Sequence, residues 1–239
     1  MALTENVLIG GLSSVAIVSI GAIVGVIFYI KARKMDLKLL KLASVMIFFT
    51  TLFYLGTLTD FLVIFFLGHN MSNQFGQHAI IGFMFIPPAL VIAIYIAAEL
   101  ITPDKKRVIV SIYIIFGILF EFFLIVFPFA NFEFPPHIPG DELIESEFIL
   151  EAPVFIIAAI FIVSLIAFNG IGFFAKSFKA PGKIKTKFRY LSLGFILAGI
   201  TFTFDAIFDV LVSPIADAFI DAISTLFIAL FIYLGLKTT

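Results

Sequence analysis

The chain of 239 residues has no cysteine, no tryptophan and few charged side chains. Without cysteine it can form neither a disulfide nor a thiolate-ligated metal site. Without tryptophan, an aromatic belt at a membrane surface would have to use its six tyrosines and some of its 33 phenylalanines. Charged residues make up only 13% of the chain and hydrophobic residues 62%, which is more apolar surface than a soluble domain of this length can bury. The composition therefore predicts an integral membrane protein.

The sequence also lacks the motifs of the common enzyme classes. It contains no Walker A, G-x-S-x-G, G-x-G-x-x-G or kinase signature. The three histidines, His69, His78 and His137, form no HxxxH or HExxH pattern, so a hydrolytic zinc site is not indicated. We therefore expect no enzymatic activity, no metal, no cofactor and no nucleic-acid partner.

Seven apolar segments are each close to or above the roughly 20 residues that cross about 30 Å of hydrocarbon. They span residues 7–30, 37–67, 79–101, 108–130, 153–175, 188–212 and 214–236. The second is longer than a crossing needs, so it should tilt or extend past the bilayer. The third contains Pro87-Pro88, which predicts a kink. We predict one all-α membrane domain over residues 1–239, a seven-transmembrane-helix bundle.

All 15 lysine and arginine residues fall on one side of such a bundle. They lie in the connections 31–41, 102–107 and 176–189 and at Lys237. Because basic residues are retained in the cytoplasm, this pattern predicts an outside N-terminus, a cytoplasmic C-terminus and a multi-pass protein of the cytoplasmic membrane. The basic loops could contact a cytoplasmic signalling partner, or they could anchor the chain to anionic lipid of the bilayer.

The opposite side of the predicted bundle is acidic. The connection after the fourth segment contains six acids: Glu133, Asp141, Glu142, Glu145, Glu147 and Glu151. The three histidines fall on the same side. Within this connection, residues 141–150 are expected to form a short acidic amphipathic helix lying on the membrane.

The stretch 202–224 contains four aspartates in apolar sequence. Asp205 and Asp209 are spaced i, i+4, and so are Asp217 and Asp221, so each pair lies on one face of a helix. Ser213-Pro214 between the pairs is typical of an N-cap followed by a first-turn proline. The stretch therefore predicts a helical hairpin with two stacked carboxylates on each arm.

Asp60 and Glu121 add two acids to the outer half of the bundle. Because no lysine or arginine lies there, a buried carboxylate must be protonated, bind a cation or face water. The candidate ligand- or ion-binding residues are therefore Asp60, Glu121, Asp205, Asp209, Asp217 and Asp221. Hydration at the membrane surface explains the shallow Asp209 and Asp217 better, whereas a function explains Glu121, Asp205 and Asp221 better.

Seven helices with this orientation would also fit a retinal protein. A retinal Schiff base needs a lysine inside the bundle, and every lysine falls in a predicted cytoplasmic loop or the tail. We therefore expect no retinal.

Three stretches resemble the seven-helix membrane region found at the N-terminus of many prokaryotic histidine kinases. They read IPPALVIAIYIAAELITPDKKR, KTKFRYLSLGFILAGITF and SPIADAFIDAISTLFIALFIYLGLK. The resemblance covers essentially the whole chain and implies a receptor-like membrane module. In that family the membrane region feeds a cytoplasmic transmitter domain. These 239 residues contain none, so the signal is expected to pass through a partner.

Two functions of different class follow from these patterns. The first is a receptor-like membrane sensor with an acidic outward-facing cavity, signalling through a partner. The alternative is a small secondary transporter or channel for protons or cations, which needs polar groups along a path to both sides. The inner half offers little beyond Ser111, Ser164, Asn169, Ser192 and Glu99, and this asymmetry favours the sensor. A structural membrane subunit without a site of its own is the third possibility.

Overall fold

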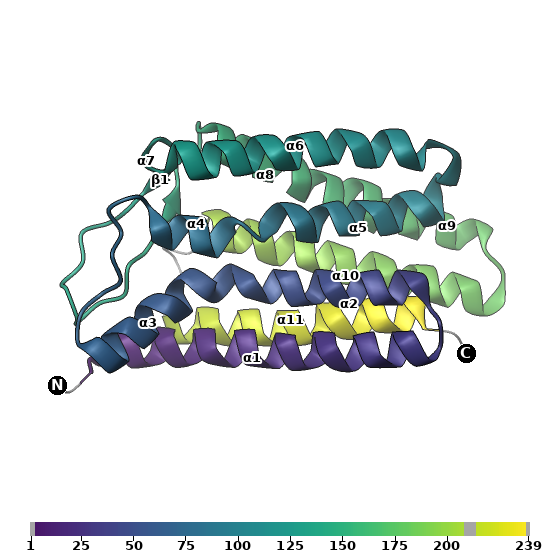
Figure 1. The fold of residues 1–239 in the computed structure, drawn as a ribbon. Helices are drawn as coiled ribbons and strands as arrows, with labels where there is room; N and C mark the ends of the chain where they lie inside the picture. The colour runs from purple at the N-terminus through teal and green to yellow at the C-terminus, as the bar shows by residue number, and fades with distance from the viewer. Residues whose placement is uncertain (1–2, 208–213, 238–239) are drawn as a thin grey trace.

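A computed structural model describes residues 3–207 and 214–237. Most of the described chain is helical, as the sequence predicts, and the helices run along a common direction as a bundle (Figure 1). In the described part, five helical stretches are long and apolar enough to cross a membrane: Glu5–Lys34, Lys38–Leu67, Gln77–Ile101, Pro103–Val126 and Pro153–Lys179. The chain therefore has the helices of a membrane protein.

The first helix, α1 (Glu5–Lys34), has favourable residues at both ends. The Thr4 hydroxyl accepts a hydrogen bond from the Val7 amide, Glu5 lies in the first turn, and basic residues fill the last turn. Small residues on its buried face, including Gly11, Gly21 and Gly25, let α1 pack closely against its neighbours.

The second predicted segment forms two helices in one continuous stretch. α2 (Lys38–Thr51) passes through a single 3₁₀ turn, Leu52–Tyr54, into α3 (Leu55–Leu67). Figure 1 shows α3 turning away from the line of α2 toward the start of α1. The excess length of this segment is therefore taken up by a bend. Gly68, with φ 76°, ends α3 in the left-handed conformation.

The proline pair breaks the third predicted segment into two helices. α4 (Gln77–Phe83) ends before the pair, and α5 (Ile86–Ile101) begins with Pro87 and Pro88 in its first turn. Neither proline has an N–H, so the helical ladder cannot continue through them. The predicted kink is confirmed, and it amounts to a full interruption.

α6 (Lys106–Val126) and the short α7 (Pro128–Asn131) are followed by a connection over residues 132–152 that contains no helix. Strands β1 (Phe132–Glu133) and β2 (Glu147–Phe148) pair antiparallel across it, and Gly140 turns with φ 80°. The prediction of an amphipathic helix over residues 141–150 is therefore wrong. The reason is that the Gly140 and Ile144 amides donate to side chains elsewhere in the fold and not to helical carbonyls.

The basic connection 176–189 is also largely helical. α8 (Pro153–Ser164) continues through a π-helical segment, Leu165–Ile171, into α9 (Gly172–Lys179), and α10 (Gly182–Ile207) starts three residues later. α10 therefore begins at Gly182, not at residue 188 as predicted. Hydropathy marks where apolar residues stop, but a helix of lysine and arginine can extend past that point because both are good helix formers.

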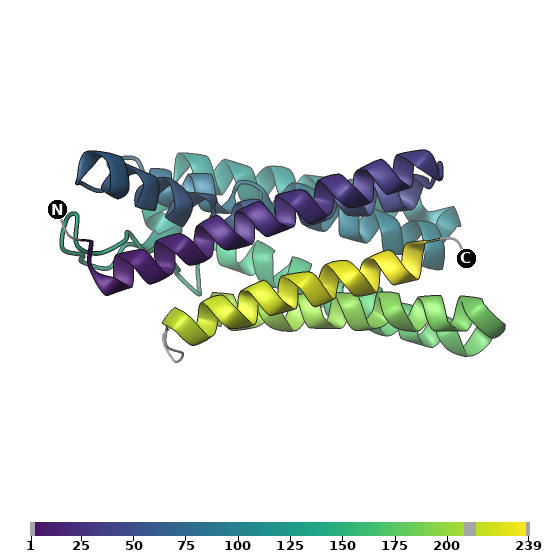
Figure 2. The ribbon, with the colours of Figure 1, turned by 90° about the horizontal axis from the view of Figure 1, so that it is seen from below.

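The remaining helix, α11 (Pro214–Leu236), lies beside α10 as an antiparallel partner (Figure 2). It begins at the proline that the sequence marks as a first-turn residue. α1 contacts α2 and α11, and α5 lies between α2 and α6. Fully buried phenylalanines, among them Phe120, Phe161, Phe173 and Phe195, fill the interior.

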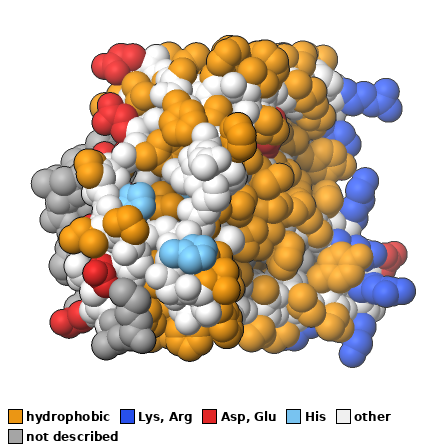
Figure 3. Space-filling model, turned by 60° about the vertical axis from the view of Figure 1, so that its left-hand side comes forward, with side chains coloured by type: hydrophobic (Ala, Val, Ile, Leu, Met, Phe, Trp, Pro, Cys, Tyr) orange, Lys and Arg blue, Asp and Glu red, His pale blue; other side chains and the backbone are white. Residues whose placement is uncertain are grey.

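Charge is segregated along the bundle, as Figure 3 illustrates. Lysine and arginine gather at one end, acidic residues and histidines at the other, and apolar side chains cover the surface between them. Two ion pairs join described residues, Lys41 with Asp36 at 2.7 Å and Lys106 with Glu99 at 2.5 Å, and both lie at the basic end.

Candidate functional site

Asp60 is the most deeply buried acid of the described chain. Its exposed fraction is 0%, and it lies on α3 near the acidic end. One carboxylate oxygen accepts a hydrogen bond from the Met71 amide at 2.7 Å. The other accepts from the Ile144 amide at 2.8 Å and from the Asn70 side-chain amide at 2.9 Å. Three donors therefore stabilise this carboxylate without any cation.

Asn70 extends this arrangement to the far connection. Its side-chain N–H also donates to the Glu142 carbonyl at 2.8 Å, and its side-chain oxygen accepts from the Gly140 amide at 2.7 Å. We call Asp60 and Asn70, with the backbone groups of residues 71, 140, 142 and 144 that they bind, the outer latch. The latch joins α3 to two connections that are far apart in sequence.

The hydrogen bonds of the outer latch are not among the states that the sequence predicts for Asp60. From the sequence, a buried carboxylate would be protonated, bind a cation or face water. A fourth possibility, hydrogen bonding to backbone amides, is the one found in the structure. The donors that serve Asp60 include residues 11 and 84 positions away in sequence, so no local pattern predicts them.

A histidine–serine pair lies beside the latch, and no sequence pattern predicts it. Nδ1 of His78 is hydrogen-bonded to the Ser146 hydroxyl, which connects α4 to the acidic connection. His78 is 7% exposed, and its Nε2 is buried without a partner. A single histidine and a single serine 68 positions apart resemble ordinary loop residues until the fold brings them together.

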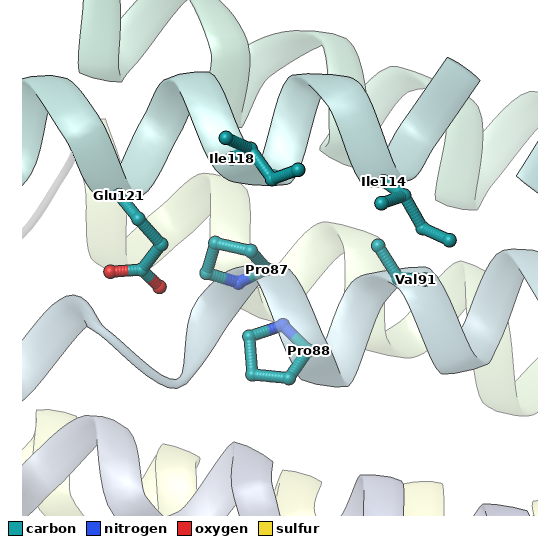
Figure 4. A pocket seen from close by; sticks show the side chains of 7 residues that line it. Pro87, Pro88, Val91, Ile114, Ile118 and Glu121 are labelled. Atoms are coloured by element: carbon teal, nitrogen blue, oxygen red, sulfur yellow. The ribbon is translucent and has the colours of Figure 1, made fainter. Parts of the chain in front are cut away.

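Glu121 occupies a different place, on the surface of α6. It is partly buried and lies at one end of an apolar groove of about 330 Å³ between α5 and α6. Figure 4 shows its carboxylate directed toward Pro87, next to the break between α4 and α5. Gly117, one turn earlier on α6, allows α6 to approach Pro87 closely, because a Cβ there would lie 3.1 Å from the Pro87 side chain.

The four aspartates of the predicted hairpin fall in or next to the part of the chain that is not described. Asp209 lies outside the described residues. Asp205 belongs to α10, and Asp217 and Asp221 belong to α11, but their side chains lie outside the description too. The pairing of α10 with α11 agrees with the predicted hairpin, whereas the arrangement of its carboxylates stays a prediction.

The fold does not bring Asp60 and Glu121 together. α3 and α6 lie on opposite sides of the bundle in Figure 1, and the latch and the Glu121 groove are separate features. Among residues 3–207 and 214–237 no group of three or more acidic, histidine or cysteine side chains is placed to hold a metal ion. Every lysine lies toward the basic end, and none is buried.

Asn169 is a buried polar residue in the inner half of the bundle whose hydrogen bonding is incomplete. Asn169 lies in the π-helical segment with an exposed fraction of 0%. Its N–H donates to the Ala93 carbonyl at 2.8 Å, while its side-chain oxygen has no partner. Ser164 and Tyr113 bond to each other nearby. These groups are isolated from the outer latch by apolar side chains of the core.

Comparisons with known proteins give no match: no family model, curated protein or solved structure is similar to this chain. Three features of the described chain bear on its function: the outer latch, the groove at Glu121 and the helices that link the acidic end to the basic end.

Proposed function

We propose that the chain crosses the membrane seven times, with α10 and α11 as the last two crossings and the N-terminus outside. Two observations support this topology. α1 begins and α11 ends at opposite ends of the bundle (Figure 1), as an odd number of crossings requires. The basic residues gather at one end (Figure 3), and the positive-inside rule assigns that end to the cytoplasm.

Single cysteines in this cysteine-free chain test the topology. We expect a membrane-impermeant maleimide to label Glu133→Cys, in β1, on intact cells. Lys183→Cys, in the first turn of α10, should react only after the cells are permeabilised. Labelling of Lys183→Cys from outside intact cells would contradict the proposed orientation.

Within this topology the chain acts as a receptor-like sensor in the cytoplasmic membrane, as the resemblance to histidine-kinase membrane regions implies. The observation that carries the proposal is the continuity of α10. This helix of 26 residues is about 39 Å long at 1.5 Å per residue. It has Lys183, Lys185 and Lys187 near its start and Asp205 near its end. A shift of the aspartate hairpin would therefore move the basic surface as one rigid element.

The outer latch supports the same function. It fastens the acidic connections to α3, and the Thr4 hydroxyl donates to the Asp141 carbonyl at 2.6 Å, so α1 is joined to them as well. A change in protonation or cation binding among the outer acids would thus act on helices and not on free loops. The signal would leave through a cytoplasmic partner at the basic connections 31–41, 102–107 and 176–189.

Spin labels at Lys34→Cys and Lys183→Cys can detect this transmission in nanodiscs. We expect the distance between the ends of α1 and α10 to change by about 1–2 Å, the size of typical helix shifts in signalling, between pH 5 and pH 8 or on addition of a cation. Asp205→Asn or Asp221→Asn should abolish the change. Glu147→Gln, which removes an exposed outer acid, should retain it. An invariant distance in the unsubstituted chain under all these conditions would contradict the sensor.

Transport of protons or cations is the second candidate, and the Glu121 groove favours it. A carboxyl beside an interrupted helix is an arrangement that transporters use, because the interruption frees backbone carbonyls. Flux of protons in proteoliposomes that is lost in Glu121→Gln, without any change at the basic end, would favour transport over sensing.

A further inference from the structure

A second hollow lies at the basic end of the bundle, away from the outer latch and from Glu121. Its volume is about 310 Å³, and it opens between the start of α2, the end of α5, the start of α10 and the end of α11. Leu40, Leu100, Phe188 and Leu191 form its apolar walls. The close contact of α10 with α11 at Gly235, where a Cβ would lie 2.5 Å from Leu191, closes one side.

The hollow has two lysines in its lining, and one of them, Lys38, also interacts electrostatically with Glu99. Lys38 and Lys187 take part in no ion pair of the described chain. The Lys38 ammonium lies 5.9 Å from the centre of the Tyr95 ring, a contact that leaves its charge in place. The backbone adds to the positive potential, because Leu37, the N-cap of α2, offers no side-chain acceptor to the first amides of this helix.

The acids near the hollow are already paired. Asp36 is in the lining but is bonded to Lys41 at 2.7 Å, and this hydrogen bond together with the Lys41 charge lowers the pKa of the Asp36 carboxyl. Glu99 is bonded to Lys106 at 2.5 Å. The hollow therefore combines apolar walls with a net positive rim.

We propose that this hollow binds one anionic phospholipid, with its phosphate between Lys38 and Lys187 and the start of an acyl chain against Leu100, Phe188 and Leu191. The charge of the rim matches a phosphodiester, and the apolar walls match the glycerol ester region and first methylenes. Basic pockets between membrane helices commonly bind such headgroups. The proposed orientation places this lipid in the inner leaflet. Only the assignment to that leaflet rests on the proposed function.

A lipid fits this site better than an acidic peptide. The walls come from four helix ends that lie where the apolar surface of the bundle gives way to its basic end. A lipid at that depth can keep its phosphate at the rim while its chain follows the apolar surface. A peptide segment would have to bury backbone amides and carbonyls there without partners, which is costly.

Native mass spectrometry of the full chain in detergent tests the site. Phosphatidylglycerol and phosphatidylcholine with the same acyl chains serve as probes. We expect one phosphatidylglycerol to be retained in preference to phosphatidylcholine. Lys38→Gln and Lys187→Gln should each lower that retention about fivefold, and the double variant about 25-fold, on the usual contribution of a basic residue at a lipid surface.

The matched control is the double variant Lys34→Gln/Lys179→Gln, which removes two charges from the same end but outside the hollow. Its effect on retention should be less than about twofold, since exposed charges at a distance are screened. Leu100→Trp fills the hollow while it keeps every charge, and should lower the retention of both lipids. Melting temperatures measured without lipid identify any variant whose fold is altered.

Three outcomes would overturn the proposal. An equal loss of phosphatidylglycerol retention in the Lys38 and Lys187 variants and in the control pair would mean that the lipid binds to a diffuse basic surface and not to the hollow. Equal retention of both lipids would mean that no headgroup is recognised. Displacement of the lipid by an acidic peptide would make the hollow a protein-docking site. Because no stimulus is applied in this experiment, its result is independent of whether the chain senses or transports.

Discussion

Asp60→Ala is expected to lower the free energy of unfolding by about 3–5 kcal/mol, the largest loss for any single acid of the described chain. The substitution removes a fully buried acceptor and leaves three donors of the outer latch without partners. Each unsatisfied buried donor costs about 1–3 kcal/mol. The loss is smaller than their sum because the connections can relax toward water.

Thermal unfolding in detergent measures this effect, and limited proteolysis locates it. Cleavage should increase within residues 138–146, which the latch holds against α3. Asp60→Asn should fall between the wild type and Asp60→Ala, because an amide keeps one acceptor oxygen but directs a donor toward the amides. Glu147→Ala, at an exposed acid of the same end, is the control and should change stability by less than about 0.5 kcal/mol. Equal stability of Asp60→Ala and this control would show that the latch is not a stabilising element.

The positions of the helices could be predicted because they follow from local sequence. The second apolar segment was expected over residues 37–67 and occupies Lys38–Leu67. The proline pair correctly marks an interruption, and Pro214 correctly marks the start of α11, whereas the predicted N-cap Ser213 lies outside the described residues. These features depend on apolar runs and on the missing N–H of proline, which are visible in a single sequence.

The backbone conformation and hydrogen bonds of the acidic end could not be predicted, because they depend on contacts between residues that are distant in sequence. The bond from the Ile144 amide to Asp60 fixes the connection in an extended form, so its charge pattern, which suggested a helix, does not decide its structure. The π-helical segment around Asn169 also lacks a clear sequence signal, apart from an Asn-Gly pair within an apolar run. Hydropathy likewise does not show that most of the basic connection 176–189 is helical. The reason is that helix propensity and lipid exposure are separate properties.

The start of α10 at Gly182 has the largest consequence for the proposed function. A flexible loop over residues 176–189 would have been a contact surface without a mechanical link to the acidic end. A helix that starts at Gly182 and reaches Ile207 provides that link. Transport does not need such a link, whereas a sensor that reports to a partner does. The early start of α10 is therefore the reason for which we propose sensing before transport.

Gly21→Leu is expected to destabilise the bundle by about 3 kcal/mol, at the upper end of the usual cost of overpacking. Gly21 lies on the buried face of α1, and a Cβ there would lie 1.7 Å from the Thr51 methyl carbon. Thr51 cannot move aside easily, because it is 1% exposed and its hydroxyl donates to the Phe48 carbonyl at 2.8 Å. α1 would have to separate from α2, and every contact between the two helices would weaken.

Ala16→Leu is the matched control, since Ala16 lies on the exposed face of the same helix. It adds the same type of side chain toward lipid or detergent, where it meets no packed neighbour, so its melting temperature should match that of the wild type. The spin-label pair at residues 34 and 183 gives a second measurement, because separation of α1 from α2 would broaden the distances between these labels. If Gly21→Leu melts with the wild type and keeps its narrow distances, α1 does not pack on α2 through its small residues, and the bundle must be held together by other faces of α1.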